Sequence, residues 1–503
     1  GFTGPSMAQS FDQTAISELP RIGNTPPTTR GDLCIRDDGK DYNKSESRSD
    51  SDPSKFNGYQ TGKVEDPYGG KKIGMVRTTL IFFTNQVGIG ILSLPGMLHT
   101  IGLIPGIITI IAFGVLATYT AYILIQFYRR YPQIRDVVDV GRIMGGRTLE
   151  IIVGIAHVLN LCLICASANV TLSIALNTIT DHGLCTVGFI GIPMIICWLL
   201  CMPRTFSFAG WFGIPATISI FTSVIIVIIA LAVNGPNTST PGYLGESANE
   251  PLVMLLGPNP AATMNQQFES VLNVAFAYAG NQAFITVMCE MRNPSKDYPK
   301  AIIWLNIFGV PMYVIVACVI YSMAGQYVVS PALGSAPGVA SQVAYGILFP
   351  TMLGSGLVFG HTGIKYMYNV VMDNIIKTRH KLTDNTFLTW CVWLGLGTTF
   401  WVTAFVLANA VPAFNSILAI SSALFVTWFT FGMANAQWIF INWGYQFSTW
   451  RKSLLAIFNW FMILASAFLT VFGLYTSISD LNARIQDPND PLNVFTCADN
   501  SLF

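Results

Sequence analysis

Apolar residues along this chain gather into long unbroken runs, and polar residues are confined to the segments between them. A helix that crosses a bilayer needs about 20 mostly apolar residues, and runs of that order occur eleven times. The pattern therefore predicts an all-α polytopic membrane protein with eleven transmembrane helices. The predicted spans cover residues 76–98, 102–128, 148–176, 185–203, 208–233, 267–290, 301–325, 340–364, 386–410, 412–434 and 453–478.

The segment before the first span has a different composition. From Met7 to Gly74 it is rich in Asp, Ser, Gly, Pro and Lys, and such a segment buries too little apolar surface to offset the entropy of ordering. We therefore expect residues 1–75 to form a disordered cytoplasmic tail, with residues 1–6 a cloning remnant. Residues 76–478 form the membrane domain, and residues 479–503 form an extracellular tail.

The overall composition excludes several classes of protein. Hydrophobic residues make up 52% of the 503 residues, charged residues only 11%, and the mean hydropathy is +0.52. A soluble domain carries roughly 25% charged residues, so a soluble protein of this size is excluded. The net charge of +1 also lacks the basic footprint of a nucleic-acid binder.

The basic residues predict the orientation of the spans. Lys and Arg concentrate in cytoplasmic loops of membrane proteins. With eleven spans, 26 of the 27 basic residues fall in the N-terminal tail and on the same side of the membrane, and the exception is Arg484. We therefore expect a cytoplasmic N-terminus and an extracellular C-terminus.

Two of the predicted spans are interrupted by polar residues and glycine near their middle. A glycine costs about 1 kcal/mol in a helix, and a proline such as Pro95 costs more. Both interruptions are therefore expected to unwind the helix. The residues concerned are Thr84, Asn85, Gln86, Val87, Gly88, Ile89 and Gly90 in span 1, and Phe276, Tyr278, Ala279, Gly280, Asn281 and Gln282 in span 6.

The two interruptions lie five spans apart, in helices that run in opposite directions. Matched breaks of this kind indicate a transporter built from two inverted repeats. Freed amides near Gly88–Gly90 can bind a carboxylate and freed carbonyls near Ala279–Asn281 can bind an ammonium group, which together describe an amino acid. The alternative is that the glycines only allow neighbouring helices to pack closely.

Two segments resemble a known family. Residues 85–95, NQVGIGILSLP, resemble the first helix of the amino acid/auxin permease family. Residues 290–302, EMRNPSKDYPKAI, resemble the E-x-x-N-P-x-x-x-x-P-x-A-I element of the wider amino acid–polyamine–organocation superfamily. The resemblance covers about residues 75–478 and is closest to fungal plasma-membrane neutral amino acid permeases.

This resemblance implies a leucine-transporter-type fold with five-plus-five inverted repeats and one extra helix. It also implies uptake of neutral amino acids by proton symport across the plasma membrane. Phe276 and Tyr278 near the predicted pocket favour aliphatic or aromatic substrates. Sodium-coupled animal members carry an Asn three residues before the valine, where this chain has Thr84, with Asn85 one place later. The departure favours protons over sodium, although a hydroxyl can also bind sodium.

Other candidate residues follow from position in the predicted spans. Ionisable groups inside a membrane are functional candidates; these are Glu269, Glu290, His157 and His361, for proton coupling or gating. Each has an alternative: Glu269 a simple interfacial position, Glu290 a structural ion pair, and the histidines hydrogen bonds satisfied within the bundle. Polar groups of spans 3 and 8 that could reach the pocket are Asn160, Ser167, Thr351 and Ser355.

Two cysteines and one asparagine are predicted on the outer side. Only Cys185 and Cys497 lie in a compartment where disulfides persist, so they are expected to pair; the alternative is two free thiols on a disordered tail. Asn237 begins a glycosylation sequon in an outer loop. No cofactor, metal site or enzymatic constellation is expected.

The sequence thus predicts a secondary transporter that imports neutral amino acids by alternating access, in a lipid bilayer and without nucleic acid. One rival is a sodium-coupled symporter. Another is a sensor that binds an amino acid without moving it and signals through its tail, a role with which the Ser-rich N-terminus is compatible. A channel is less favoured because it needs a lined pore. The sequence leaves the oligomeric state open.

Overall fold

The computed structural model of the chain describes residues 73–204, 207–238, 244, 247–377, 384–411, 413–486 and 494–500. Nearly all of the predicted N-terminal tail lies outside these residues. The described part is helical throughout, apart from loops and an isolated parallel bridge between Ile73 and Met291. The predicted all-α membrane fold is therefore confirmed.

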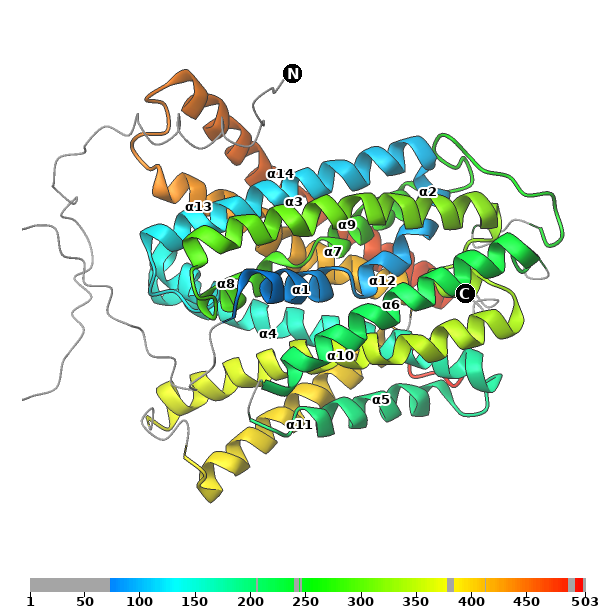
Figure 1. Cartoon of the computed structure of the whole chain (residues 1–503), viewed down its shortest axis with the longest axis horizontal. Helices are drawn as coiled ribbons and strands as arrows, with labels where there is room; N and C mark the ends of the chain where they lie inside the picture. Colours follow the sequence, from blue (N-terminus) through cyan, green and yellow to red (C-terminus); the bar gives the residue numbers. More distant parts are fainter. Residues whose placement is uncertain are drawn as a thin grey trace, which may run out of the picture. The chain divides into compact units, whose positions relative to one another are not determined.

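The helices of the first half correspond to predicted spans 1–5. They are α1 (Met75–Gln86), the 3₁₀ helix η2 (Ile89–Ser93), α2 (Leu94–Ile101), α3 (Leu103–Arg130), α4 (Val137–Thr180), α5 (Thr186–Leu200) and α6 (Ser207–Asn234). Figure 1 shows these helices running alongside those of the second half.

The helices of the second half correspond to predicted spans 6–11. They are α7 (Met264–Ala277), α8 (Asn281–Cys289), α9 (Pro294–Ala324), the short 3₁₀ helices η3 (Gly325–Tyr327) and η4 (Ala332–Ser335), α10 (Gly338–Val370), the π-helical η5 (Val371–Ile375), α11 (Phe387–Ala410), α12 (Phe414–Ser421), the π-helical η7 (Ser422–Gly432), α13 (Met433–Ile441) and α14 (Trp450–Gln486).

Nine helical segments in the described residues are long and apolar enough to cross a membrane. The pair formed by α1 and the helix after it, bent by 41°, makes a tenth span. The eleventh apolar helix, α5, has 15 residues, which is shorter than the about 20 that a bilayer requires. The predicted count of eleven therefore depends on α5 and stays a prediction.

Several helices extend beyond the predicted spans. The α4 helix begins at Val137 and kinks at Gly145 and Gly146, where Gly146 has a φ of 68°. The Asp136 side chain accepts hydrogen bonds from two backbone amides at the start of α4 and so caps it. Helices α9, α13 and α14 likewise run several residues past the predicted limits. Hydropathy detects the apolar part of a helix and misses polar turns that caps and neighbouring helices stabilise.

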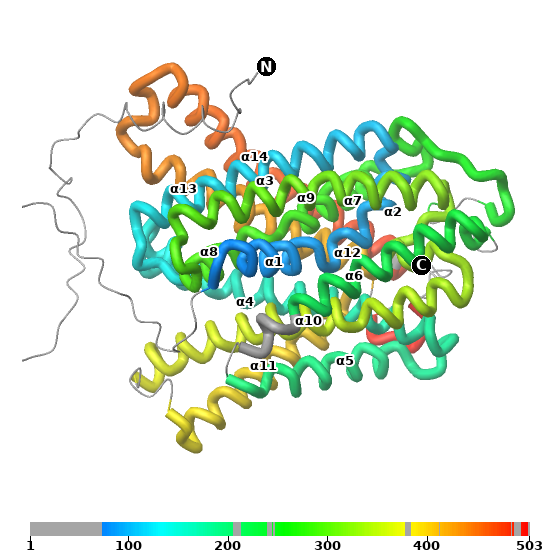
Figure 2. The backbone as a smooth tube through the Cα atoms, in the orientation of Figure 1, coloured from blue at the N-terminus to red at the C-terminus, as the bar shows by residue number. Residues whose placement is uncertain are grey.

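Spans that are five apart in the sequence pack against each other. The α3 helix packs on α9, α4 on α10 and α5 on α11. Figure 2 draws these helices as a backbone tube with their labels. Such pairing is expected when two five-span repeats are related by a pseudo-two-fold axis in the membrane plane. Small residues bring some pairs close: a Cβ at Gly360 of α10 would lie 2.6 Å from the ring of Trp401 in α11.

The two ends of the helix bundle differ in chemistry. At one end, called the basic end here, Arg129 donates to the carbonyl of Ser295, and Arg204 donates to the carbonyl of Asp384. At the other, called the disulfide end, a disulfide joins Cys185 and Cys497. The loops alternate between these two ends along the chain, as the distribution of basic residues predicts.

Candidate functional site

The two broken spans meet at their breaks. The α1 helix ends at Gln86 and η2 begins at Ile89, while α7 ends at Ala277 and α8 begins at Asn281. Gly90 packs directly on the end of α7, because a Cβ built on it would lie 2.5 Å from the Cα of Ala277. A glycine is therefore required at position 90 for the two breaks to touch.

A tyrosine from a third helix joins both breaks. The hydroxyl of Tyr313 in α9 lies 2.8 Å from the carbonyl oxygen of Gln86 and 2.9 Å from that of Ala277. Tyr313 is fully buried, and its ring packs edge-on against Tyr278 with centroids 5.3 Å apart. Since one hydroxyl proton serves two carbonyls freed by helix breaks, Tyr313 holds the breaks together. The sequence analysis missed it because nothing separates it from other tyrosines in spans.

Buried amide side chains link α8 to the surrounding helices. Asn160 of α4 donates to the Oε1 atom of Gln282, and Ser421 of α12 donates to the Oδ1 atom of Asn160 at 3.2 Å. Asn281 donates to Thr120 of α3 at 2.8 Å, and also to the backbone carbonyl of Thr430.

The predicted residues Asn160, Asn281 and Gln282 therefore lie together. The sequence analysis missed the contribution of span 10, made through Ser421 and Thr430. Its signal is the set of buried hydroxyls that continues from α12 into the π-helix η7 (Ser416, Ser421, Ser422, Thr427 and Thr430). A π-helical segment often marks a functional site.

A cavity of about 60 Å³ opens on the basic side of the breaks. It lies between α1, α4, α6, α8 and α10, and the predicted residues Thr84, Asn85, His157, Gln282 and Glu290 line it. The Nε2 atom of Gln282 is buried and has no hydrogen-bond partner among the described residues. The cavity has room for a few water molecules and presents polar groups beside the breaks.

Other predicted residues pack around the breaks without lining this cavity. A Cβ at Gly88 would lie 3.3 Å from the hydroxyl of Ser355, and one at Gly280 would lie 3.2 Å from the Oε1 atom of Gln86. The Tyr278 hydroxyl donates to the carbonyl of Ile110 at 2.9 Å. The remaining members of the breaks are buried or partly buried (Val87, Ile89, Phe276 and Ala279).

Three predicted polar groups of the scaffold bond elsewhere. Ser167 donates to the carbonyl of Ile164 in its own helix at 2.8 Å, and Thr351 donates to the carbonyl of Ala216 at 2.7 Å. His361 bonds the carbonyl of Pro203 at 3.0 Å. The contacts of Thr351 and His361 join separate segments, and that of Ser167 stays within α4; a role of the three residues in substrate binding stays a prediction.

The two candidate glutamates lie on opposite sides of the breaks. Glu290 follows α8 at the basic end, where its carbonyl accepts a hydrogen bond from the amide of Ile73, just before α1. Glu269 is 2% exposed in α7 and lines a smaller cavity on the disulfide side. His157 lines the larger cavity and packs edge-on against Tyr366 and Phe429.

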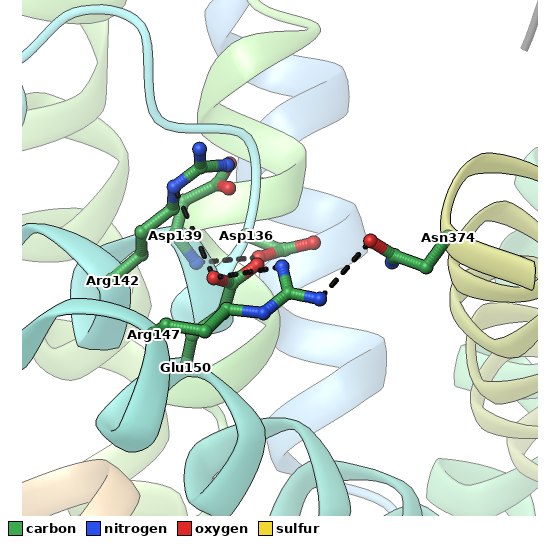
Figure 3. A network of polar contacts seen from close by, with 6 residues as sticks. All are labelled: Asp136, Asp139, Arg142, Arg147, Glu150 and Asn374. Atoms are coloured by element: carbon green, nitrogen blue, oxygen red, sulfur yellow. Dashed lines mark hydrogen bonds and ion pairs between the residues drawn. The ribbon is translucent and has the colours of Figure 1, made fainter. Parts of the chain in front are cut away.

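A charged network at the basic end connects α4 to the end of span 8 (Figure 3). Glu150 lies 3.5 Å from Arg147 and 3.9 Å from Arg142, and Arg147 also donates to Asn374 of η5 at 3.1 Å. Exposed ion pairs contribute little stability. The contact between Arg147 and Asn374 therefore matters mainly as a link between the two helices.

Asp136 lies beside this network (Figure 3). The pKa of its carboxyl is raised to about 6. Burial is the largest cause, and the nearby carboxylates of Asp139 and Glu150 also raise the pKa. Hydrogen bonds from the amides of Val138 and Asp139 oppose it. Asp136 thus changes its charge around pH 6.

The disulfide end carries the predicted pairing. Cys185, just before α5, is bonded to Cys497, and their Cα atoms lie 4.5 Å apart. Asn500 is buried beside them, where it donates to Ser173 at 2.8 Å and accepts from Asn177 at 2.7 Å. The described segment 494–500 is thereby fixed to α4 and α5. Asn237 follows α6 at this same end, and its glycosylation stays a prediction.

The fold and the paired breaks place the protein among membrane transporters built on broken helices. Residues 71–479 match the family described as transmembrane amino acid transporter protein. The N amino acid transport system protein of Neurospora crassa is 30% identical over 430 residues, which are 85% of this chain and 88% of that protein.

Other similar proteins have lower identity. A transmembrane transporter of Gibberella moniliformis is 27% identical over 86% of this chain and 89% of its own length. Amino acid permease 8 of Arabidopsis thaliana is 23% identical over 52% of this chain and 59% of its own length. The chain belongs to the transmembrane amino acid transporter family, whose members are multi-pass membrane transporters and not enzymes.

Proposed function

We propose that this protein imports neutral amino acids by proton symport across the plasma membrane. The observation that carries the proposal is the contact between the two helix breaks, which places unwound backbone of α1 and of α7 side by side. Unwound backbone inside a membrane is tolerated only where it is buried in protein or lines a cavity. The matched breaks in this chain meet that condition beside the cavity on the basic side.

The chemistry of the breaks suits a zwitterion. Amides near Gly88 and Gly90 are suited to a carboxylate, and carbonyls near Ala279 and Asn281 to an ammonium group. The side chains that connect the breaks to other helices are amides and hydroxyls, such as Asn160, and the predicted residues at the breaks include no charged side chain. This supports a substrate with an uncharged side chain.

The basic and disulfide ends support a direction for the membrane. Lys and Arg favour the cytoplasmic side, and disulfides persist outside the cytosol. The basic end would then be cytoplasmic and the disulfide end extracellular. The N amino acid transport system protein, by its name, transports amino acids, which is consistent with uptake.

Proton coupling is proposed from Glu269 and Thr84. Glu269 is a buried carboxyl on a membrane span, which is the kind of group that relays protons. Thr84 takes the place of an expected sodium-ligating Asn, and its hydroxyl lies 2.8 Å from that of Thr217 and 2.9 Å from the carbonyl of Leu80. The support for the proton over sodium comes from the replacement of Asn by Thr at this position.

Uptake by the purified protein in proteoliposomes tests the proposal. A radiolabelled neutral amino acid should accumulate when the outside is acidic, and Glu269→Gln should lose this pH-driven accumulation. A sensor would bind the amino acid and move none of it. Accumulation that requires sodium and ignores pH would exclude proton coupling while leaving the transporter function intact.

A further inference from the structure

The small cavity on the disulfide side of the breaks is enclosed by parts of both repeats. It lies between α2, α7, α12 and the segment that joins α9 to α10, and its volume of about 10 Å³ holds about one water-sized particle. Glu269 and Asn273 of α7 line it together with Ser330 and Asn415. Asn273 lies one helical turn before Ala277, where α7 ends.

The walls of this cavity present oxygen lone pairs. The hydroxyl of Ser93 donates to the carbonyl of Gly90 at 2.9 Å, and that of Ser330 donates to the Oδ1 atom of Asn415 at 2.7 Å. Since each hydroxyl proton is already used, each oxygen offers only lone pairs to the cavity. The hydroxyl of Thr100 is likewise directed to its own helix, at the carbonyl of Gly96.

One polar atom of the cavity lining, the Oδ1 atom of Asn273, lacks a hydrogen-bond donor among the described residues. The Asn273 residue is only 3% exposed. A buried acceptor without a donor costs about 1–3 kcal/mol. No Lys, Arg or His is among the described residues that line the cavity, so the particle that satisfies Asn273 must itself bring positive charge or protons.

We propose that this cavity binds the coupling cation, a single small monovalent cation held by oxygen atoms of Glu269, Asn273 and Ser330. The proposal rests on the proposed function, because it locates the ion of that transport cycle. Both hydronium and sodium have this chemistry. A hydronium transfers one proton to the Glu269 carboxylate and leaves neutral water beside the carboxylic acid, whereas sodium remains as an ion with oxygen ligands.

The position of the cavity gives the cation a role in closing one side of the transporter. Its ligands come from α7, which carries one break, and from Ser330, which lies outside the broken spans and bonds Asn415 of α12. A bound cation would tie these parts together on the disulfide side. The substrate could then reach only the cavity on the basic side.

Other titratable groups on the elements packed against α7 lie outside this lining. His99 of α2 is 2% exposed and lies beside Asn259 and Tyr321. The α14 helix carries Tyr475 and Asp480 towards the disulfide end. The variants below therefore change only cavity ligands and keep these groups.

The test uses the full chain in proteoliposomes and in detergent. Initial uptake of a radiolabelled neutral amino acid is measured against outside pH from 5 to 8 and against sodium from 0 to 100 mM. Thermal stability is measured under the same conditions without amino acid. The variants are Asn273→Leu, Asn273→Asp and Ser330→Ala, and the matched control is Asn306→Leu, since the Asn306 amide donates within α9 to the carbonyl of Ile302.

For wild type and the control, we expect uptake and melting temperature to rise with one of the two cations. Asn273→Leu should need at least a tenfold higher concentration of that cation, Ser330→Ala should shift less, and Asn273→Asp should restore the response. A response to pH identifies hydronium and a response to sodium identifies sodium; either supports the site. If Asn273→Leu misfolds, Ser330→Ala carries the comparison.

The site would be overturned if Asn273→Leu and Ser330→Ala both responded to the cation as wild type does. Wild-type uptake that depends on neither cation would also overturn it. Either result leaves amino acid transport standing. A complete lack of uptake by the folded wild type would instead reject the proposed transport function.

Discussion

Gly90→Ala should separate the two helix breaks. The new Cβ would lie 2.5 Å from the Cα of Ala277, whereas carbon atoms in contact sit about 3.5–4.0 Å apart. The end of α7 must therefore move by about 1 Å. A backbone atom blocks the space, so side-chain rotation cannot relieve the overlap.

The cost can be worked from this displacement. Overpacking of a filled interior costs about 1–3 kcal/mol. A shift of about 1 Å is also enough to break the 2.9 Å hydrogen bond between Tyr313 and the carbonyl of Ala277, worth about 1 kcal/mol. A misplacement of about 1 Å in a site can cost about a hundredfold in rate, so we expect uptake to fall at least about tenfold, and the stability cost should lower the melting temperature.

Initial uptake at equal protein loading, together with the melting temperature, checks this prediction. Gly395→Ala is the matched control, because no atom lies within 4 Å of a Cβ at that position in α11. An alanine there should leave uptake unchanged and raise helix stability slightly. Uptake by Gly90→Ala within twofold of wild type would refute the close contact of the breaks.

Tyr313→Phe leaves the carbonyls of Gln86 and Ala277 without their shared donor, so the free energy of unfolding should fall by about 1–3 kcal/mol and uptake about tenfold. Normal uptake would contradict the bridging role. For Asp136, the folded pKa of about 6 exceeds the unfolded value of about 3.9, so ionisation costs stability at pH 7 and the cost disappears as the pH falls towards 4. Melting of wild type against pH should show a gain of about 3 kcal/mol that Asp136→Asn lacks, and equal pH profiles would refute it. Cys497→Ser should lower the free energy of unfolding by about 2–5 kcal/mol, measured under non-reducing conditions. An unchanged melting temperature would show that the cross-link adds no stability.

Much of the fold is predictable from local composition. The long apolar runs locate the helices, because the bilayer requires about 20 apolar residues for each span. The polar and glycine residues at Asn85–Gly90 and Gly280–Gln282 locate the breaks, because glycine and polar groups destabilise a helix inside the membrane. The start of α4 is missed because the capping carboxylate of Asp136 extends it beyond its apolar part.

The walls of the site are less predictable, because they depend on packing between distant segments. Tyr313 and Ser421 belong to ordinary apolar spans, and only the fold brings them to Gln86 and Asn160. Ser167 and Thr351 have suitable positions along their spans, yet their hydroxyls bond backbone carbonyls of helices. For Ser167 and Thr351 the polar residue indicates a buried hydrogen bond, and the sequence does not specify its partner.

Recognition of the amino acid backbone at the breaks is the central claim. Competition measures it most directly: uptake of radiolabelled leucine into proteoliposomes is followed with excess unlabelled leucine, leucine methyl ester or N-acetyl-leucine. We predict that leucine competes fully, whereas the ester lacks the carboxylate, the acetyl derivative lacks the ammonium group, and both compete at least a hundredfold more weakly. Equal competition by either derivative would contradict the account.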